Sequence, residues 1–331
     1  MSNSNNQIPG WFSAVTGRLV TLFCLLLLAS VLGLSSAVRA QAPEPSAQFF
    51  RTVLVAGSDN TAFNLRFMDL LQNQLGSRVK VRTYTEAFSL SHPDLLVVAL
   101  GSNALSQVQQ QSPRPATLAL MVDENQVAAY LGRERTTLSA IYHNPPLIRQ
   151  ALLGKLILPQ GNQVALLVQA GEEARYDPLL EELARFELEA RVFPVQGEDA
   201  LIATLARALS FGDFLLAVPD SAIYNARTIK HILLTAYRRN RIVIGPGRAF
   251  VRAGVLASSY TSLETVTAIA AERVRQFLDD GSLAPPGHPE RFEIDVNRQV
   301  ARSLNIPVPD TDELAQGINA LLQNDAGSDN P

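Results

Sequence analysis

The chain has 331 residues, of which 47% are hydrophobic and 18% are charged, so it can bury a large core and is expected to form about two domains. It carries 28 lysines and arginines against 31 acidic residues, which gives a formal net charge of −3. A mildly acidic chain without a basic run lacks the electrostatic footprint of a nucleic-acid-binding protein. Nucleic acid is therefore excluded from the expected partners.

The first 40 residues have the order of a secretory signal peptide. A polar start that ends at Arg18 precedes an apolar run over 19–34, and the small side chains at Val38 and Ala40 suit cleavage after Ala40. The alternative is an uncleaved membrane anchor, although about 16 apolar residues are few for a span that normally needs about 20. We therefore expect a soluble mature protein in the periplasm, with a proline-containing spacer over 41–47.

The only cysteine, Cys24, lies inside this apolar run. Phe23 precedes it, where a lipoprotein signal would need a small residue, so we expect no lipidation. Cleavage would leave a thiol-free protein, which suits an oxidising compartment and rules out disulfides and thiol catalysis.

Beyond the spacer, short apolar runs alternate with helical periods. Most of the runs are continuous, as buried parallel strands are, so the pattern predicts an α/β protein with doubly wound sheets. Prolines 145 and 146 begin an expected helix that ends at Pro159, and a second strand-helix series follows it. The expected strands cover residues 51–57, 78–84, 94–101, 116–122, 163–169, 190–196, 213–219 and 241–245.

The sequence lacks the common motifs for catalysis, metals and cofactors. There is no P-loop, no HExxH and no GxSxG, and the glycine pattern at Gly245-Pro246-Gly247 is incomplete because residue 250 is phenylalanine. The four histidines lie far apart without metal-ligand spacing; they are His92, His143, His231 and His288. We therefore expect no catalytic residue, no metal and no cofactor, and enzyme function ranks behind binding.

Polar turns follow three of the expected strands. Gly57-Ser58-Asp59-Asn60, Gly101-Ser102-Asn103-Ala104 and Pro219-Asp220-Ser221 each come before a predicted helix. Open α/β sheets bind ligands at the carboxyl ends of their strands, and several helix N-termini that face one cleft would bind a carboxylate. The alternative is that these residues only cap helices. Both interpretations remain open at this point.

Residues 213–260 and two later motifs resemble the ABC-transporter substrate-binding proteins of the type that includes tryptophan and tyrosine binders. The family's pattern is a strand that ends in a polar turn, a helix, a strand that leads to an Ala-Gly-Ala-Leu-Ala-like segment, and an Asn-containing strand near the end. The last two correspond here to Ala253-Gly254-Val255-Leu256-Ala257 and Val296-Asn297-Arg298-Gln299-Val300-Ala301. The resemblance covers most of residues 50–308.

The resemblance implies the type I periplasmic binding protein fold, in which two α/β lobes, each a doubly wound and mainly parallel sheet flanked by helices, clamp a ligand between them. Lobe one would be 48–142 with 248–285, lobe two would be 143–247 with 286–310, and 311–331 would be a solvated C-terminal tail. Only nine residues, Thr85 to Pro93, separate the second and third expected strands, fewer than a parallel crossover normally needs, so we expect an abbreviated lobe one.

The implied function is that of a periplasmic solute receptor, which hands a small carboxylate-bearing ligand, such as an amino acid, to an inner-membrane ABC permease and its ATPase. The alternative is an envelope protein that senses a ligand or acts as a scaffold with the same fold and without transport. An enzyme is the third candidate. The sequence leaves the oligomeric state open.

The predicted ligand site combines the polar turns with tyrosines near them. Lobe one would offer donors to a carboxylate, Asp220 would pair with an ammonium group, and Tyr224, one helical turn later, would pack against the apolar part of the ligand. The alternative is that Asp220 only caps the helix near Ala222 and that Tyr224 belongs to the core. The full set is Ser58, Ser102, Asn103, Tyr142, Asp220, Ser221, Tyr224 and Tyr260.

Overall fold

The computed structural model describes residues 51–87, 95–131 and 138–328. The predicted signal peptide, its cleavage site and the spacer lie outside these residues. None of the helices in the described segments is long and apolar enough to cross a bilayer.

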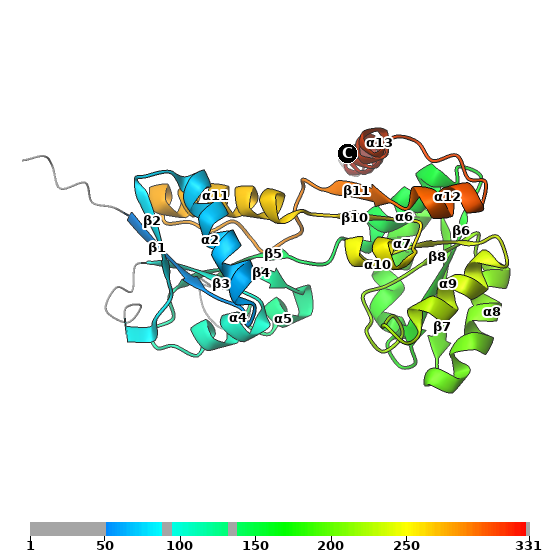
Figure 1. Cartoon of the computed structure of the whole chain (residues 1–331), viewed down its shortest axis with the longest axis horizontal. Helices are drawn as coiled ribbons and strands as arrows, with labels where there is room; N and C mark the ends of the chain where they lie inside the picture. Colours follow the sequence, from blue (N-terminus) through cyan, green and yellow to red (C-terminus); the bar gives the residue numbers. More distant parts are fainter. Residues whose placement is uncertain (1–50, 88–94, 132–137, 329–331) are drawn as a thin grey trace, which may run out of the picture. The chain divides into compact units, whose positions relative to one another are not determined.

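The first sheet has five parallel strands in the order β2-β1-β3-β4-β5, with helices on both faces (Figure 1). Its strands are β1 (Arg51–Ala56), β2 (Val79–Thr83), β3 (Leu96–Leu100), β4 (Ala116–Val122) and β5 (Leu138–Tyr142). The helices between them are α2 (Thr61–Leu75), α4 (Ser102–Gln109) and α5 (Glu124–Ala128). The short connection from β2 to β3 joins strands on either side of β1, and most of it lies outside the described residues.

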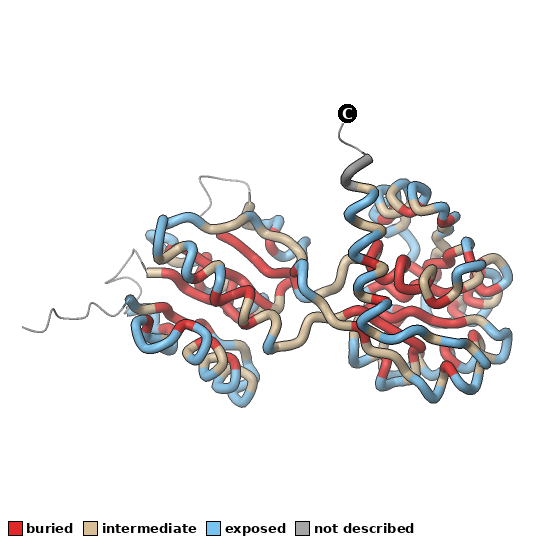
Figure 2. The backbone as a smooth tube through the Cα atoms, turned by 90° about the horizontal axis from the view of Figure 1, so that it is seen from above, coloured by how far each residue is buried: buried red, intermediate tan, exposed pale blue. Residues whose placement is uncertain are grey.

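Continuous apolar runs form this sheet because both of its faces are covered. Successive side chains of a strand point to opposite faces. In β1, Val53 and Val55 pack in one cluster, which includes residues of α2, while Leu54 packs in the other, which includes residues of α4 and α5. All three are almost completely buried. Figure 2 shows buried residues concentrated inside each sheet-and-helix unit, with exposed residues mainly on its outside.

The second sheet has six strands in the order β11-β10-β9-β8-β6-β7, all parallel except β11, which runs antiparallel to β10. Its strands are β6 (Gln163–Gln169), β7 (Glu189–Val195), β8 (Phe214–Leu216), β9 (Ile242–Ile244), β10 (Ala257–Tyr260) and β11 (Glu293–Val296). Its helical segments are α6 (Leu147–Ile157), η1 (Glu173–Tyr176), α7 (Asp177–Ala184), η2 (Glu198–Ala200), α8 (Leu201–Phe211), α9 (Ile229–Tyr237), α10 (Arg248–Ala253), α12 (Arg298–Ser303) and α13 (Thr311–Ser328).

Two of the predicted boundaries are wrong. Residues 248–260 were assigned to lobe one, but β10 pairs with β9 and β11 in the second sheet, and only the helix after it, α11 (Leu263–Asp280), packs with the first sheet. The predicted C-terminal tail contains the helix α13, which buries Leu314 and Ile318 in the core of the second sheet. Ala315, Leu321 and Leu322 of the same helix pack partly buried against this core.

Three segments join the two sheets in the described part of the chain. The first crossover, 143–146, leads from β5 to α6; the second, 261–262, leads from β10 to α11; and the third, 281–292, returns from α11 to β11. The third crossover lies beside β5, where the backbone of Gly287 donates to Ala140 and accepts from Tyr142, both at 3.0 Å.

Two consecutive residues in the first turn of α6 contact the third crossover and the strand β10. Arg149 is 6% exposed; its Nη2 donates to the carbonyl oxygen of Pro289 at 3.0 Å, and its guanidinium lies 4.1 Å from the ring centroid of Phe292. Gln150 is fully buried, with Nε2 donating to Ser258 Oγ and to the Ser259 carbonyl oxygen, both at 3.0 Å, and Oε1 accepting from the Ser259 N–H at 2.9 Å. One helix therefore follows the first crossover, bonds to the third and bonds to the strand that leads into the second.

The position of α6 against the second sheet depends on a glycine. A Cβ atom at Gly154 would lie 2.6 Å from the Phe214 ring of β8, closer than real Cβ contacts allow. The absence of a side chain therefore lets the helix that carries Arg149 and Gln150 approach the sheet closely.

We predict that Gln150→Leu lowers the free energy of unfolding by about 1–3 kcal/mol, because it leaves the buried N–H group of Ser259 unpaired, whereas the Ser259 carbonyl oxygen still accepts from Ser258 Oγ at 2.9 Å. Gln160→Leu, an exposed change just beyond α6, should alter it by less than about 0.5 kcal/mol. Denaturant unfolding checks both, and equal stability of the Gln150 variant and the wild type would contradict the assigned role.

Candidate functional site

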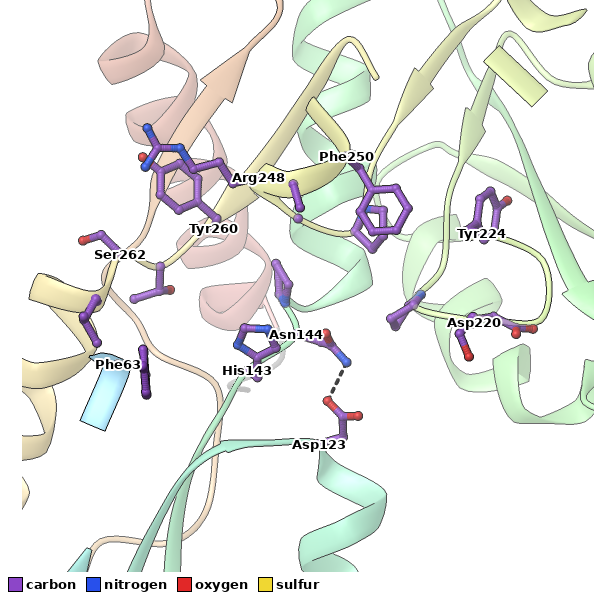
Figure 3. Close-up of a pocket in the computed structure, with 18 of the residues that line it drawn as sticks. Phe63, Asp123, His143, Asn144, Asp220, Tyr224, Arg248, Phe250, Tyr260 and Ser262 are labelled. Atoms are coloured by element: carbon purple, nitrogen blue, oxygen red, sulfur yellow. Dashed lines mark hydrogen bonds between the residues drawn. The ribbon is translucent and has the colours of Figure 1, made fainter. Parts of the chain in front are cut away.

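A cavity of about 760 Å³, here called cavity A, is bounded by segments from both sheets (Figure 3). The second sheet contributes residues that follow β8, β9 and β10, and the first contributes residues of α2 and of the segments after β4 and β5. These are the carboxyl ends of parallel strands, where open α/β sheets bind ligands. The residues labelled in Figure 3 are Phe63, Asp123, His143, Asn144, Asp220, Tyr224, Arg248, Phe250, Tyr260 and Ser262.

Two arginines of cavity A each have one acidic partner. Arg66 of α2 bonds to Glu264 at 2.5 Å, and Arg248 bonds through Nε to Asp295 at 3.2 Å. The Arg248 guanidinium also lies 4.9 Å from the ring centroid of Tyr260. A guanidinium has five N–H donors, so each arginine keeps donors for a ligand after these contacts.

A short hydrogen bond links the end of β4 to the first crossover. Asn144 Nδ2 donates to Asp123 Oδ1 at 2.6 Å, the contact marked by the dashed line in Figure 3. Next to it, burial lowers the pKa of His143, and the nearby Asp123 carboxylate only partly opposes this effect. His143 is therefore held in its neutral form at the edge of the cavity.

The Asp220 carboxylate accepts one hydrogen bond from a nearby backbone N–H and can accept others. Its Oδ1 accepts from the backbone N–H of Ala222 at 2.8 Å, so the carboxylate caps the turn after β8, as the alternative interpretation predicted. Among the described residues it forms no ion pair. Tyr224 is 3% exposed and lies in the core of the second sheet, and burial raises the pKa of its hydroxyl.

A second cavity of about 960 Å³, cavity B, adjoins cavity A. The two share Asp123, Asn144, Pro145, Pro219, Asp220 and Ser221. Cavity B extends over η1 and α7 of the second sheet, and Tyr142 and His288 of the crossovers also line it. These two rings meet edge to face, with centroids 5.1 Å apart.

The predicted site residues fall into two groups. Asp220, Ser221, Tyr224 and Tyr260 line cavity A, and Tyr142 lines cavity B. Ser58, Ser102 and Asn103 line neither.

Ser58 and Asn103 of this second group bond to other residues of the first lobe. The Ser58 hydroxyl bonds to Asn64 Oδ1 at 2.9 Å, and Asn103 Nδ2 donates to Asp59 at 3.3 Å. The role of all eight residues in ligand binding stays a prediction.

Several lining residues were not predicted from the sequence. Asp123 directly follows the apolar run of β4, so the rule that selected the other polar turns would have found it. Arg248 and Phe250 follow β9 in the stretch that was considered only as an incomplete glycine motif. No sequence pattern marks Arg66 as a site residue, because it lies more than one turn beyond the start of α2 and does not follow a strand.

No protein-family model and no curated protein sequence matches the chain. Solved structures do. The ligand-free, open structure of a substrate-binding protein with adhesive properties from Clostridium difficile is 15% identical, with 78% of this chain and 95% of that chain covered and a TM-score of 0.64. A conserved domain protein from Vibrio cholerae is 17% identical, with 79% and 96% covered and a TM-score of 0.50.

This chain has the type I periplasmic binding protein fold. The fold predicted from the sequence, two lobes with mainly parallel sheets flanked by helices, is thereby confirmed. At these identities the similarity establishes the fold, and the site must be argued from the residues of this chain.

We predict that the stability of the protein falls as the pH is lowered from 7.5 to 5.5. Burial lowers the pKa of His143, and the Asp123 carboxylate opposes this effect in part. Burial and the positive charge of Arg149 lower the pKa of His288, and the Glu124 carboxylate opposes this effect in part. The unfolded chain, with histidine pKa values of about 6.5, then binds protons more readily than the folded one, so stability present above that pH is lost below it.

Thermal unfolding across this pH range measures the effect. The double variant His143→Asn, His288→Asn should show a shallower dependence, while His231→Asn, an exposed change on α9, should keep the slope of the wild type. Identical slopes for all three proteins would contradict the prediction.

Proposed function

We propose that this chain is an exported solute-binding protein that clamps a small molecule between its two lobes and delivers it to an ABC-type importer in the inner membrane. The observation that carries the proposal is cavity A, because strand ends of both sheets bound it. A ligand in such a cavity contacts both lobes and therefore favours their closure. The crossovers are the described segments that join the two sheets, so closure of the lobes requires the chain to bend there.

We infer that the ligand carries a carboxylate, as an amino acid does. Arg66 and Arg248 line cavity A and have more guanidinium donors than their ion pairs use, which suits a carboxylate, whereas Ser58, Ser102 and Asn103 line neither cavity. Asp220, which lacks an ion-pair partner in the described part of the chain, suits an ammonium group.

Aromatic residues complete the argument for a small organic ligand. Phe63 of α2, Phe250 of α10 and Tyr260 of β10 line cavity A, each from a different element. Ligand sites typically combine such apolar walls with a few polar groups that set orientation. The apolar walls and polar groups of cavity A can hold a ligand without reacting with it, which supports binding over catalysis.

A thermal-shift screen of the mature chain against amino acids and other small carboxylates tests the proposal. A ligand present at about 100 times its dissociation constant should add about 2.7 kcal/mol of stability. Absence of any stabilising solute would contradict it. A ligand that binds without ever stimulating the ATPase of a co-reconstituted importer would instead favour the sensing alternative.

We predict that Asp220→Asn weakens binding of the ligand found in the screen by about 1.5–3 kcal/mol, the range for a hydrogen bond to a charged group. Asparagine keeps the oxygen that caps Ala222, so the melting temperature without ligand should hardly change. Asp310→Asn is a matched control, because Asp310 makes the same type of cap to the N–H of Asp312 at 2.9 Å outside both cavities. Calorimetry that finds unchanged affinity for the Asp220 variant would remove this residue from the site.

We predict that the chain purified from the periplasmic fraction begins at Gln41. The support is the apolar run over 19–34 and the small residues before the cleavage position. Mass spectrometry of the intact protein measures the N-terminus. Membrane-bound protein that still carries residues 1–40 would show that the segment is an anchor.

A further inference from the structure

A third cavity of about 500 Å³, here called cavity C, lies on the second lobe and shares no lining residue with cavities A and B. It is formed by β7, by the C-terminal half of α8 and by Arg239, which follows α9. The two helices lead into β8 and β9, so their C-terminal ends lie at the amino ends of these strands. Cavity C therefore lies toward the amino ends, whereas cavity A follows the carboxyl ends of the same strands.

Three arginines from three parts of the lobe line cavity C, and no acidic side chain does so among the described residues. They are Arg191 of β7, Arg207 of α8 and Arg239. Arg207 and Arg239 form no ion pair in the described part of the chain, and Arg191 contacts one acid, the exposed Glu189, at 3.3 Å. Protein surfaces usually mix charges of both signs, so cavity C is a local excess of positive charge.

Neutral groups of the lobe hold two of these arginines in place. Arg239 Nη1 donates to the Ala206 carbonyl oxygen at 2.9 Å and to Ser210 Oγ at 3.3 Å, both on α8. Arg207 Nη2 donates to the hydroxyl of the buried Thr204 at 3.1 Å. A guanidinium has five N–H donors, so these contacts orient both charges without neutralising them and leave donors for a ligand.

The third arginine stands beside an apolar wall. The guanidinium of Arg191 lies 4.2 Å from the ring centroid of Phe211, and the rings of Phe211 and Phe193 have centroids 5.9 Å apart. Arg191 and Phe193 lie on the same face of β7, because side chains two residues apart on a strand point the same way. Cavity C thus combines positive charge with aromatic surface, which suits an anion that carries an organic group.

The charge excess continues outside the cavity. Residues 221–263, which include Arg239, contain no aspartate or glutamate, although the whole chain has a net charge of −3. Arg238 in this stretch is exposed and forms no ion pair within the described residues, while Arg241 pairs with Asp213 at 3.2 Å. An anion that approaches cavity C therefore meets little repulsion from carboxylates of this stretch.

We propose that cavity C binds a phosphoryl group, carried by a small phosphate ester or by a lipid headgroup. A phosphate monoester has about 1.5 to 2 negative charges at neutral pH and oxygens that point in several directions. It can therefore accept hydrogen bonds from several guanidinium groups at once, whereas a carboxylate has two oxygens in one plane. Arg207 and Arg239 donate to the phosphoryl oxygens, and Phe193 and Phe211 contact the organic part. This site is separate from the cavity of the proposed function and does not depend on it.

Isothermal titration calorimetry of the mature chain tests the chemistry of the site. Phenyl phosphate and benzoate share an aromatic ring and differ in the anion. We expect phenyl phosphate to bind at least about tenfold more tightly than benzoate. Binding that survives in the double variant Arg207→Gln, Arg239→Gln belongs to another part of the protein and is subtracted for both probes.

Variants distinguish cavity C from a general effect of charge. Arg207→Gln and Arg239→Gln should each weaken binding of phenyl phosphate at least about threefold, the upper range for an exposed charged pair. Arg227→Gln is the matched control, because it removes the same charge from an exposed residue of the same lobe outside all three cavities. Melting temperatures report whether each variant is folded, and Arg207→Gln leaves the contact between α8 and Arg239 intact.

Vesicles separate the two sources of the phosphoryl group. Co-sedimentation with phosphatidylcholine vesicles that contain phosphatidylglycerol, weakened by Arg207→Gln and not by Arg227→Gln, would identify a lipid headgroup. Binding of phenyl phosphate without co-sedimentation would identify a soluble phosphate ester. The proposal is overturned if neither probe binds, if benzoate binds as tightly at the site, or if Arg227→Gln weakens binding as much as Arg207→Gln does.

Discussion

The hydrogen bonds of Arg149 and Gln150 are the constraint on which the rest of the structure depends. Both side chains leave the first turn of α6; Arg149 bonds to the third crossover, and Gln150 bonds to β10, which leads into the second. Burial lowers the pKa of Arg149 to about 10, so the residue still carries its charge at neutral pH, although it has no acidic partner among the described residues. The carbonyl of Pro289 and the face of the Phe292 ring stabilise this charge only in part, since Nε and Nη1 of Arg149 are buried without a hydrogen-bond partner among the described residues.

The same crossovers are fixed at the other end by residues of the first lobe and of β11. Arg273 of α11 donates to Ser139 Oγ and the Ala140 carbonyl of β5 at 2.9 and 2.8 Å, and to the Pro285 carbonyl of the third crossover at 3.5 Å. Glu293 accepts from the N–H and hydroxyl of Ser262 at 3.0 and 2.7 Å, next to the start of α11. Bending between the lobes is thereby confined to a few residues, and cavities A and B both include residues of these segments.

The sequence predicted β1 to β4 and β6 to β9, and it missed β5, β10 and β11. β10 reads Ala-Ser-Ser-Tyr, and its Ser258 and Ser259 are completely buried. Gln150 of α6 bonds to the Ser258 hydroxyl and to the Ser259 backbone, a contact that no local pattern reveals. Asp220 was found as a site candidate because it follows a strand directly, whereas Arg66 reaches cavity A only through the packing of α2. Rules based on strand ends therefore recovered part of the site, and residues from helix interiors required the tertiary structure.

The two ends of the described chain belong to different lobes, since β1 opens the first sheet and α13 packs on the second through Leu314 and Ile318. Arg185 of the second lobe adds an ion pair to Asp325 near the end of α13 at 3.0 Å. Rotation of one lobe against the other must therefore change the separation of the termini. Fluorescent labels attached at the two ends would convert ligand-driven closure into a change in energy transfer, which makes the protein a natural scaffold for an optical sensor of its own solute.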